Sequence, residues 1–461
     1  MSKSEAFVVF LLTATVTVQA YLARRPAVAV GLLFLVFKTL LLSSESITLT
    51  VTTLPLSLFT VMRNTQSFGP AFIALALTSV PHRYAAKALG VASIGALLMA
   101  LTVSTTPWLC RACWHVGLGG FFHMVALLRV EHAAMREEAH LVSSLLPVLL
   151  VEAYPPGPTG ESSEIVAVAT AFFGASVMAC AVCALLRGTM AGLLLGAIVV
   201  ASHYIYATMQ LTPRHQRDPG LLLFEFTVSH QGVVACLAVA VLAGVTAGPP
   251  ANLPKIIQRK YFHYLATFMF TPVLLWDPQV LQVAFPIALG LLCLLEMLRL
   301  STAAPRSIRG ALTTFLSRFA DERDQGVIRT HVYLLLGCAA PMMLRMSDVF
   351  SGVAILGVGD STAACLGTFF GRHKWGNVWG FRGRLPLMCA RRSVEGTLGA
   401  MASIALYYRC VGYLHPTTDS AVSRVPILVV IGGSLAEVFV SGVDNLVLPV
   451  FVMALGSCGR S

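Results

Sequence analysis

One carboxylate stands inside an apolar stretch that ends in basic residues. The stretch GVGDSTAACLGTFFGRHKW (357–375) holds Asp360 near its start and Arg372, His373 and Lys374 near its end. Ionisable groups at membrane depth are costly and are usually kept for a function. A carboxylate combined with several cations is typical of sites that handle phosphate with a hard metal ion. We therefore expect Asp360 to take part in chemistry.

Four further polar clusters follow residue 250, and no Asp occurs before Asp218. Because phosphoryl and metal chemistry draws heavily on Asp, the site is expected after residue 250. Simpler interpretations exist for three clusters: an interfacial anchor, a local ion pair and a solvated loop. These three are, in order, RKYFH (259–263), LLEMLRL (294–300) and FADERDQG (319–326) with His331 shortly after it. The last cluster is AEVFVSGVDNLVLP (436–449), and the opening stretch continues into RRSVEGT (391–397).

Motifs that are missing from the sequence narrow the chemistry. There is no GxxxxGK[ST] loop, no kinase HRD or DFG set, no GxSxG and no HExxH, so the P-loop and protein-kinase templates do not apply. The two CxxC pairs, at 110–113 and 180–183, are interpreted as small packing residues rather than zinc ligands. The remaining chemistry is Mg²⁺ bridged between Asp and phosphate oxygens, with Arg and Lys neutralising charge.

Membrane helices must position these residues. Of the 461 residues, 56% are hydrophobic and only 11% are charged, against roughly 25% charged in soluble domains. A bilayer core needs about 20 apolar residues per helix, and fewer where neighbouring helices shield it. We predict an all-α fold, a polytopic transmembrane helical bundle with roughly 13 to 15 spans. Apolar runs cover 5–22, 28–42, 88–104, 164–186, 189–209, 224–246, 279–298, 331–344, 349–371, 396–412, 424–440 and 443–457.

The polar clusters are expected on one face of the membrane, because an even number of predicted spans separates each from the next. That face also collects most of the Lys and Arg of the second half, whereas the loops near Asp277 and at 413–421 are poor in both. By the positive-inside rule this face is cytoplasmic. The net charge of +11 fits anionic phosphate ligands better than nucleic acid.

A Pro-bearing stretch, AGPPANLP (247–254), marks the predicted domain boundary. Residues 1–245 are predicted to be an N-terminal transmembrane scaffold. Residues 255–457 are predicted to be a C-terminal catalytic transmembrane domain with cytosolic loops.

A ladder of small residues within the opening stretch indicates a packing seam that lets a neighbouring backbone approach. It consists of Gly359, Ala363, Gly367 and Gly371. On an unbroken helix, Asp360 and Arg372 would stand about 18 Å apart along the axis. One alternative is a helix break at Gly357 or Gly359, which would place Asp360 at an anion-binding half-helix start. The other is that Asp360 works with another cluster, such as DNL (444–446), instead of RHKW (372–375).

The polar clusters taken together resemble dolichol kinases, the CTP-dependent members of the polyprenol kinase family, across about residues 255–455. The matching segments are RKYFH, FADERDQG followed by THVYLLLG, GVGDSTAACLGTFFGRHKWG, RRSVEGT and DNLVLP. The chain departs from the family where Arg391 and Arg392 replace two lysines and where GNVWGFRGRLPLMCA (376–390) replaces a few residues. The resemblance implies a multi-pass endoplasmic reticulum enzyme that phosphorylates the terminal hydroxyl of dolichol with CTP on the cytosolic face. Its product would be dolichyl phosphate, the lipid carrier for protein glycosylation.

Residue roles follow from this resemblance. Asp360 and Asp444 would hold Mg²⁺ or another divalent cation, or accept the hydroxyl proton, and the third catalytic residue, Glu395, would orient the basic loop. The nucleotide-binding residues would be Gly359, Ser361, Arg372, Lys374, Arg391, Arg392, Ser393, Gly396 and Thr397. The residues around the nucleotide mouth would be Arg259, Lys260, His263, Asp321, Asp324, His331 and Asn445.

Two other functions compete with this assignment. A phosphatidate cytidylyltransferase-like enzyme, or another polyprenol or phytol kinase, would share GDSxxA and SVEGT, although RKYFH and DERDQG count against a cytidylyltransferase. A membrane transporter would use Asp360 and Glu437 as ion or proton sites, but it does not explain why the polar clusters gather on one face. Incubating membranes with γ-labelled CTP and dolichol distinguishes the three.

Overall fold

The computed structural model describes residues 161–215, 218–248, 252–316, 324, 327–346, 348–375, 392–414, 427–439 and 444–458, with scattered residues between 118 and 150. The chain divides into two compact units. One, which we call the α8–η3 unit, comprises Glu152–Ser361 and Leu406–Arg424. The other, the α16–α22 unit, comprises Met1–Val151, Thr362–Ala405 and Val425–Ser461.

Helices account for the secondary structure of the described residues, which contain no strand beyond one isolated β-bridge. The prediction of an all-α fold is confirmed. The elements are α8 (Glu161–Leu185), α9 (Met190–His215), α10 (Pro219–Ser229), α11 (Gln231–Ala247), α12 (Lys255–Trp276), α13 (Pro278–Leu300), α14 (Arg306–Leu316), α15 (Thr330–Met343), η3 (Val353–Asp360), α16 (Ser361–Phe369), α19 (Val394–Leu414), α21 (Ile427–Phe439) and α22 (Asp444–Cys458).

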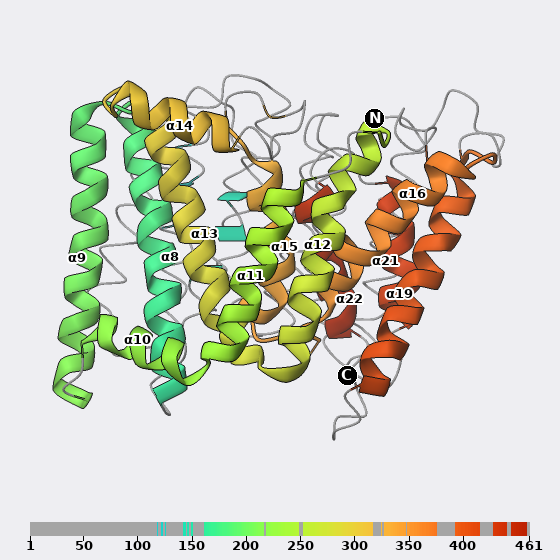
Figure 1. Ribbon diagram of the computed structural model, residues 1–461, viewed down its shortest axis with the longest axis horizontal. Helices are drawn as coiled ribbons and strands as arrows, with labels where there is room; N and C mark the ends of the chain where they lie inside the picture. Colours follow the sequence, from blue (N-terminus) through green and yellow to red (C-terminus); the bar gives the residue numbers. More distant parts are fainter. Residues whose placement is uncertain are drawn as a thin grey trace, which may run out of the picture. The chain divides into compact units, whose positions relative to one another are not determined.

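In the α8–η3 unit, α8 packs between α9 and α13, and the three helices run side by side (Figure 1). Gly290 of α13 faces the ring of Phe172 and the hydroxyl of Ser176 on α8, so the absence of a side chain lets these helices approach. The helix α12 contacts α11, α13 and η3, and α13 contacts α15. The predicted boundary at 247–254 falls in the connection between α11 and α12.

The apolar run predicted as one span at 224–246 is two helices, because the chain bends by 87° between α10 and α11. His230 lies at the bend, where its ring stacks on the ring of Phe226. Its Nδ1 is 2.9 Å from the carbonyl oxygen of Phe226. At the other end of α10, the carboxylate of Asp218 accepts hydrogen bonds from the amides of Gly220 and Leu221. Pro219 occupies the first helical position, as in many capped helices.

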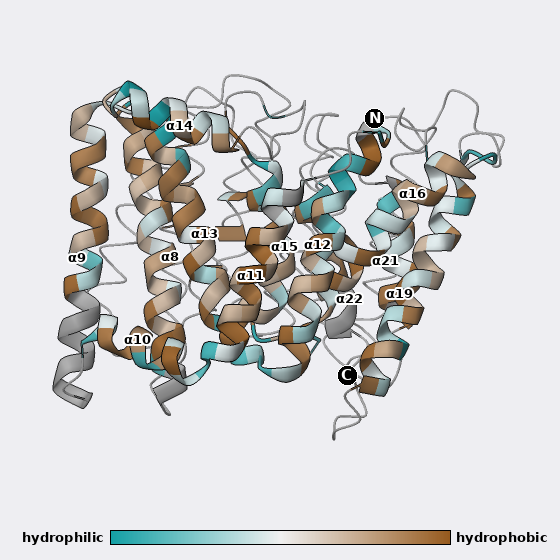
Figure 2. Cartoon of the chain, viewed as in Figure 1, coloured by the Kyte–Doolittle hydropathy of each residue, from teal (hydrophilic) through white to brown (hydrophobic). Residues whose placement is uncertain are grey.

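Two described helices are long and apolar enough to cross a membrane, at Glu164–Leu185 and Pro278–Leu300, and the bent pair α10–α11 would make a third. Apolar residues predominate along most of the helices in Figure 2. Large apolar side chains are exposed on several helices, which is expected where lipid is the solvent; they include Leu194, Ile198, Phe224, Val239, Leu242, Phe268 and Trp276. The chain is thus a helical membrane protein. The larger span number stays a prediction, because the apolar runs at 5–22, 28–42 and 88–104 lie outside the described residues.

The helix that carries Asp360 does not break at Gly357 or Gly359, so the first of the two alternatives for this stretch is wrong. Residues Val353–Asp360 form a π-helix that passes directly into α16. A side chain at Gly357 would collide with Thr267 of α12, and one at Gly352 would crowd Gly337 and Cys338 of α15. These glycines therefore serve close helix packing, and the wider π-turn changes the angular position of Asp360 without interrupting the helix.

In the α16–α22 unit, three of the four small residues predicted to form a seam, Ala363, Gly367 and Gly371, lie against the first turn of α19 or the serine before it. A side chain at Gly396, in the first turn of α19, would meet the carbonyl of Ala363 and the Cα of Gly367 on α16. Gly399 faces Leu366 in the same way. The helices α21 and α22 also pack against each other.

Candidate functional site

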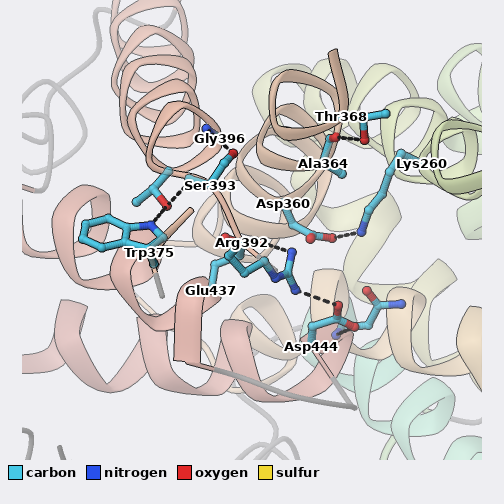
Figure 3. Close-up of polar contacts among 12 residues, drawn as sticks. Lys260, Asp360, Ala364, Thr368, Trp375, Arg392, Ser393, Gly396, Glu437 and Asp444 are labelled. Atoms are coloured by element: carbon cyan, nitrogen blue, oxygen red, sulfur yellow. Dashed lines mark hydrogen bonds and ion pairs between the residues drawn. The ribbon is translucent and has the colours of Figure 1, made fainter. Parts of the chain in front are cut away.

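The buried carboxylate of Asp360 forms an ion pair with Lys260 (Figure 3). Lys260 lies in the second turn of α12, and Asp360 is the last residue of η3; the two residues are 3% and 1% exposed. A charge taken out of water this completely needs a partner of opposite sign. The partner comes from RKYFH, so two clusters that are 100 residues apart in sequence meet in the α8–η3 unit.

His263 lies one turn after Lys260 and completes this buried polar group. Its Nδ1 is 3.1 Å from the carbonyl oxygen of Leu356 and 3.5 Å from Oδ2 of Asp360. Because a carbonyl only accepts, Nδ1 carries the proton. The hydroxyl of Ser361 donates to the same carbonyl at 3.3 Å. Burial of Lys260 and His263 excludes the interpretation of RKYFH as an anchor at the lipid interface.

The start of α15 lies beside this group. The ring of His331 meets the ring of Phe262 edge-on at 4.9 Å. Asp324 accepts hydrogen bonds from the hydroxyl of Thr330 at 2.9 Å and from the amide of Arg329 at 3.1 Å, so it holds the residues at which α15 begins. Arg259 is half-buried on α12. Asp321 lies outside the described residues.

Glu296 and Arg299 form the local ion pair predicted from their spacing, with two contacts of 2.6 and 2.7 Å. Glu296 also accepts a 2.7 Å hydrogen bond from the amide of Ile328. The end of α13 thereby fixes the segment that leads into α15, a contact that the sequence spacing did not indicate.

In the α16–α22 unit, the segment after α16 pairs with the segment before α19. Lys374 and Ser393 form an antiparallel β-bridge, and the amide of Trp375 donates to the carbonyl of Arg392 at 3.1 Å. The indole of Trp375 donates to the hydroxyl of Thr397 at 3.0 Å. RHKW and RRSVEGT therefore lie together, although residues 376–390 stand between them in sequence and lie outside the described residues.

Glu395, in the first turn of α19, holds this basic loop. Its carboxylate accepts hydrogen bonds from the amides of Arg372 and His373 at 3.2 and 3.0 Å and lies 2.6 Å from Nδ1 of His373. Hydrogen bonds from its own backbone amide and from His373 lower the pKa of Glu395 to about 2, so the carboxylate is charged at neutral pH. The hydroxyl of Ser393 accepts from the amide of Gly396 at 3.1 Å and caps α19.

Arg392 joins this loop to the last two helices. One terminal nitrogen of its guanidinium pairs with Glu437 of α21, and the other lies 3.9 Å from Asp444 at the start of α22 (Figure 3). The amide of Asn445 donates to Asp444 at 3.1 Å. Glu437 is only 3% exposed. The sequence marked Glu437 as a carboxylate in an apolar run, but it gave no sign of the arginine 45 residues earlier.

Three cations lie where residues 372–375 pair with the segment before α19: Arg372, Lys374 and Arg392. Arg372 is exposed and Lys374 is half-buried. Arg391 lies outside the described residues, as does the whole insert at 376–390. Within the described parts of the chain, no acidic side chain forms an ion pair with Arg372 or Lys374. Such cations are suited to a polyphosphate.

A metal ion would find few protein ligands here. No group of three His, Cys, Asp or Glu side chains that could hold one occurs in the described residues. Cys180 and Cys183 are free, and Cys180 donates to the carbonyl of Cys293 at 3.1 Å, consistent with packing residues. Asp444 belongs to the α16–α22 unit and Asp360 to the α8–η3 unit. One or two carboxylates fit Mg²⁺ that arrives with phosphate, since Mg²⁺ keeps several waters and needs no protein cage.

Comparison with known proteins links the chain to lipid-alcohol kinases. Human dolichol kinase is 30% identical over 270 residues, which cover 52% of this chain and 48% of the human protein. The Arabidopsis thaliana dolichol kinase EVAN is 32% identical over 161 residues, covering 33% and 26% of the two chains. The Saccharomyces cerevisiae dolichol kinase is 25% identical over 206 residues, covering 42% and 36%.

No protein-family model matches the chain, and no solved structure matches it. The chain spans at most about half the length of the curated relatives it matches. Over as much as half of its own length, it is similar to dolichol kinases from animals, a plant and yeasts.

Proposed function

We propose that this chain transfers the γ-phosphoryl group of CTP to the terminal hydroxyl of dolichol, giving dolichyl phosphate and CDP. The observation that carries the proposal is the docking of residues 372–375 on the start of α19. It gathers Arg372, Lys374 and Arg392 on one loop pair, as a triphosphate requires. Dolichol is proposed as the acceptor because the similar proteins are named dolichol kinases. CTP is proposed as the donor because RRSVEGT and GVGDS resemble motifs of CTP-dependent kinases.

The basic loop is assigned to the triphosphate. Arg372, Lys374, Arg391 and Arg392 would neutralise it, and Ser393, Gly396 and Thr397 would keep the loop in place together with Glu395. Arginine in place of the family's lysines retains the charge and adds a planar fork that suits phosphate. Loop positioning matters because phosphoryl transfer depends mainly on alignment and charge neutralisation.

Asp444 is assigned to the metal that accompanies the triphosphate. It lies at the start of a helix beside Arg392, and Asn445 follows it. Mg²⁺, or another divalent cation, would supply charge neutralisation on the phosphate oxygens when bound. Asp360 would be a metal ligand or the acceptor of the hydroxyl proton.

The buried group around Asp360 is assigned to the lipid alcohol. The hydroxyl oxygen of dolichol bonds to the γ-phosphorus, the bond from that phosphorus to the bridging oxygen of CDP breaks, and the hydroxyl proton leaves to a carboxylate or water. Lys260 and His263 would hold Asp360 in position, and Gly359 and Ser361 flank it on the same helix. Arg259, His331, Asp321 and Asp324 would border the nucleotide entrance.

We further propose the endoplasmic reticulum membrane as the location, with the catalytic loops on the cytosolic side and the bilayer as the source of dolichol. The positive charge is assigned to nucleotide binding and membrane orientation rather than to nucleic acid. We also propose that residues 255–457 form the catalytic domain and that residues 1–245 form a transmembrane scaffold.

Labelled CTP tests the reaction. Membranes containing the full chain are incubated with dolichol and with CTP labelled at either the α- or the γ-phosphate. Transfer of the γ-label to a monophosphorylated lipid is expected. Transfer of the α-label to lipid would instead identify a cytidylyltransferase, and no CTP turnover would exclude both enzymes.

A further inference from the structure

The contact between Arg392 and Glu437 joins a cation of the basic loop to a carboxylate that has no assigned role. Glu437 lies on α21 and is 3% exposed, whereas the side chain of Arg392 is 24% exposed. One terminal nitrogen of the guanidinium therefore contacts a buried carboxylate, while part of the Arg392 side chain stays exposed. A ligand would reach the terminal nitrogen that Glu437 does not hold.

The second acidic contact of Arg392 differs in kind. Asp444 lies 3.9 Å from the other terminal nitrogen, beyond hydrogen-bond range, and its side chain is 14% exposed. A phosphate oxygen that approaches from solvent can take the place of Asp444 at that nitrogen without disturbing Glu437. An arginine held at one end by a carboxylate has its planar fork already oriented for the anion at its other end.

We infer that Glu437 is a positioning residue, which holds the Arg392 guanidinium in the orientation that binds the phosphates of CTP. The inference rests on the proposed function, because that function supplies the nucleotide. It gives α21 a part in nucleotide binding. It also replaces the transporter interpretation of Glu437 as an ion or proton site with a fixed ion pair.

Nucleotide binding by the purified full chain tests this inference separately from catalysis. Binding of radiolabelled CTP is measured for wild type, Glu437→Gln, Glu437→Asp, Arg392→Gln and the Arg392→Gln/Glu437→Gln double variant. Glu437→Gln should weaken CTP binding about tenfold, the loss expected for one charged interaction. Glu437→Asp should recover most of it, because the carboxylate is retained. KM for dolichol should stay unchanged.

The double variant separates positioning from a general structural role. If Glu437 acts through Arg392, the double variant should bind CTP as Arg392→Gln does. Because it removes both charges of the pair, it also allows the measurement if Glu437→Gln alone fails to fold. Glu164→Gln is the matched control, since Glu164 is a glutamate of equal burial on α8, and it should bind CTP as wild type does.

Two results would overturn the inference: wild-type CTP affinity in Glu437→Gln, or effects of the two single changes that simply add in the double variant. Failure of the proposed function gives a different result, in which wild type makes no dolichyl phosphate. CTP binding by the variants still reports on Glu437 in that case. If wild type binds no CTP, both the function and the inference are wrong.

Discussion

At the scale of single residues, the ion pair between Lys260 and Asp360 explains how a carboxylate persists inside an apolar helix. Both side chains are almost fully buried, and His263 lies against the same oxygen of Asp360. Removing one member of a buried pair leaves an uncompensated charge, which costs about 3–5 kcal/mol. Removing both members of the pair leaves no uncompensated charge. Stability and activity should therefore respond differently to single and double changes.

Lys260→Met should destabilise the protein and reduce phosphoryl transfer by about 100-fold or more. Without its ion-pair partner, the carboxylate of Asp360 is no longer held in the position that the reaction needs. Lys260→Met/Asp360→Asn should recover much of the thermal stability but none of the activity. Thermal unfolding in detergent and the γ-label assay measure the two effects. An active double variant would remove the pair from the site.

The sequence pointed to Asp360 and to the cations of RHKW and RRSVEGT as candidate site residues. It did not indicate which residues pair with the buried charges. Asp360 is expected to matter because it is costly in an apolar run, and that cost can be seen locally. Lys260 lies 100 residues away, so nothing local assigns it to Asp360. Glu437 is a similar case, because its role becomes visible only once Arg392 is found beside it.

At the scale of helices, apolar runs predicted where most elements lie, because a span needs a continuous apolar length. The runs at 164–186, 279–298 and 331–344 correspond to α8, α13 and α15 within a few residues. The bend at His230 and the π-helix of η3 were not predictable in this way. Both leave the apolar composition unchanged and depend on packing against other helices.

Gly357 is the position at which helix packing can be tested. A methyl group there would collide with Thr267 and press on the carbonyl of His263. Gly357→Ala should separate η3 from α12, lower the melting temperature and weaken phosphoryl transfer. Gly310→Ala is the control, because nothing lies within 4 Å of its added Cβ. It should be neutral or stabilise α14 by about 0.5–1 kcal/mol. Equal behaviour of the two variants would contradict the packing argument.

At the scale of the whole molecule, the expectation that all polar clusters share one face stays a prediction, and contacts inside each unit join some of the clusters. Within the α8–η3 unit, RKYFH meets both Asp360 and the start of α15. Within the α16–α22 unit, RHKW meets RRSVEGT, and Arg392 of RRSVEGT meets both carboxylates of the last cluster. Counting the predicted spans indicates on which side of the membrane a cluster lies, but it does not predict which residues are in contact.

The orientation of that face can be tested by glycosylation, because the sequence contains no N-x-[ST] site of its own. A flexible loop carrying one site is inserted at the turn between α12 and α13, next to Asp277. It should be modified in endoplasmic reticulum membranes, since the turn is assigned to the lumen. The same loop inserted at 376–391 should remain unmodified. The reverse pattern would place the catalytic loops on the wrong side for cytosolic CTP.

The central claim is phosphoryl transfer from CTP to dolichol through Asp360, and one measurement tests it most directly. Membranes containing wild type or Asp360→Asn are incubated with γ-labelled CTP and dolichol, with Asp218→Asn, a change in the cap of α10, as the matched control. Label should appear in dolichyl phosphate with wild type and Asp218→Asn, and should be absent with Asp360→Asn at equal amounts of inserted protein. Full transfer by Asp360→Asn, or unlabelled lipid with wild type, would contradict the account.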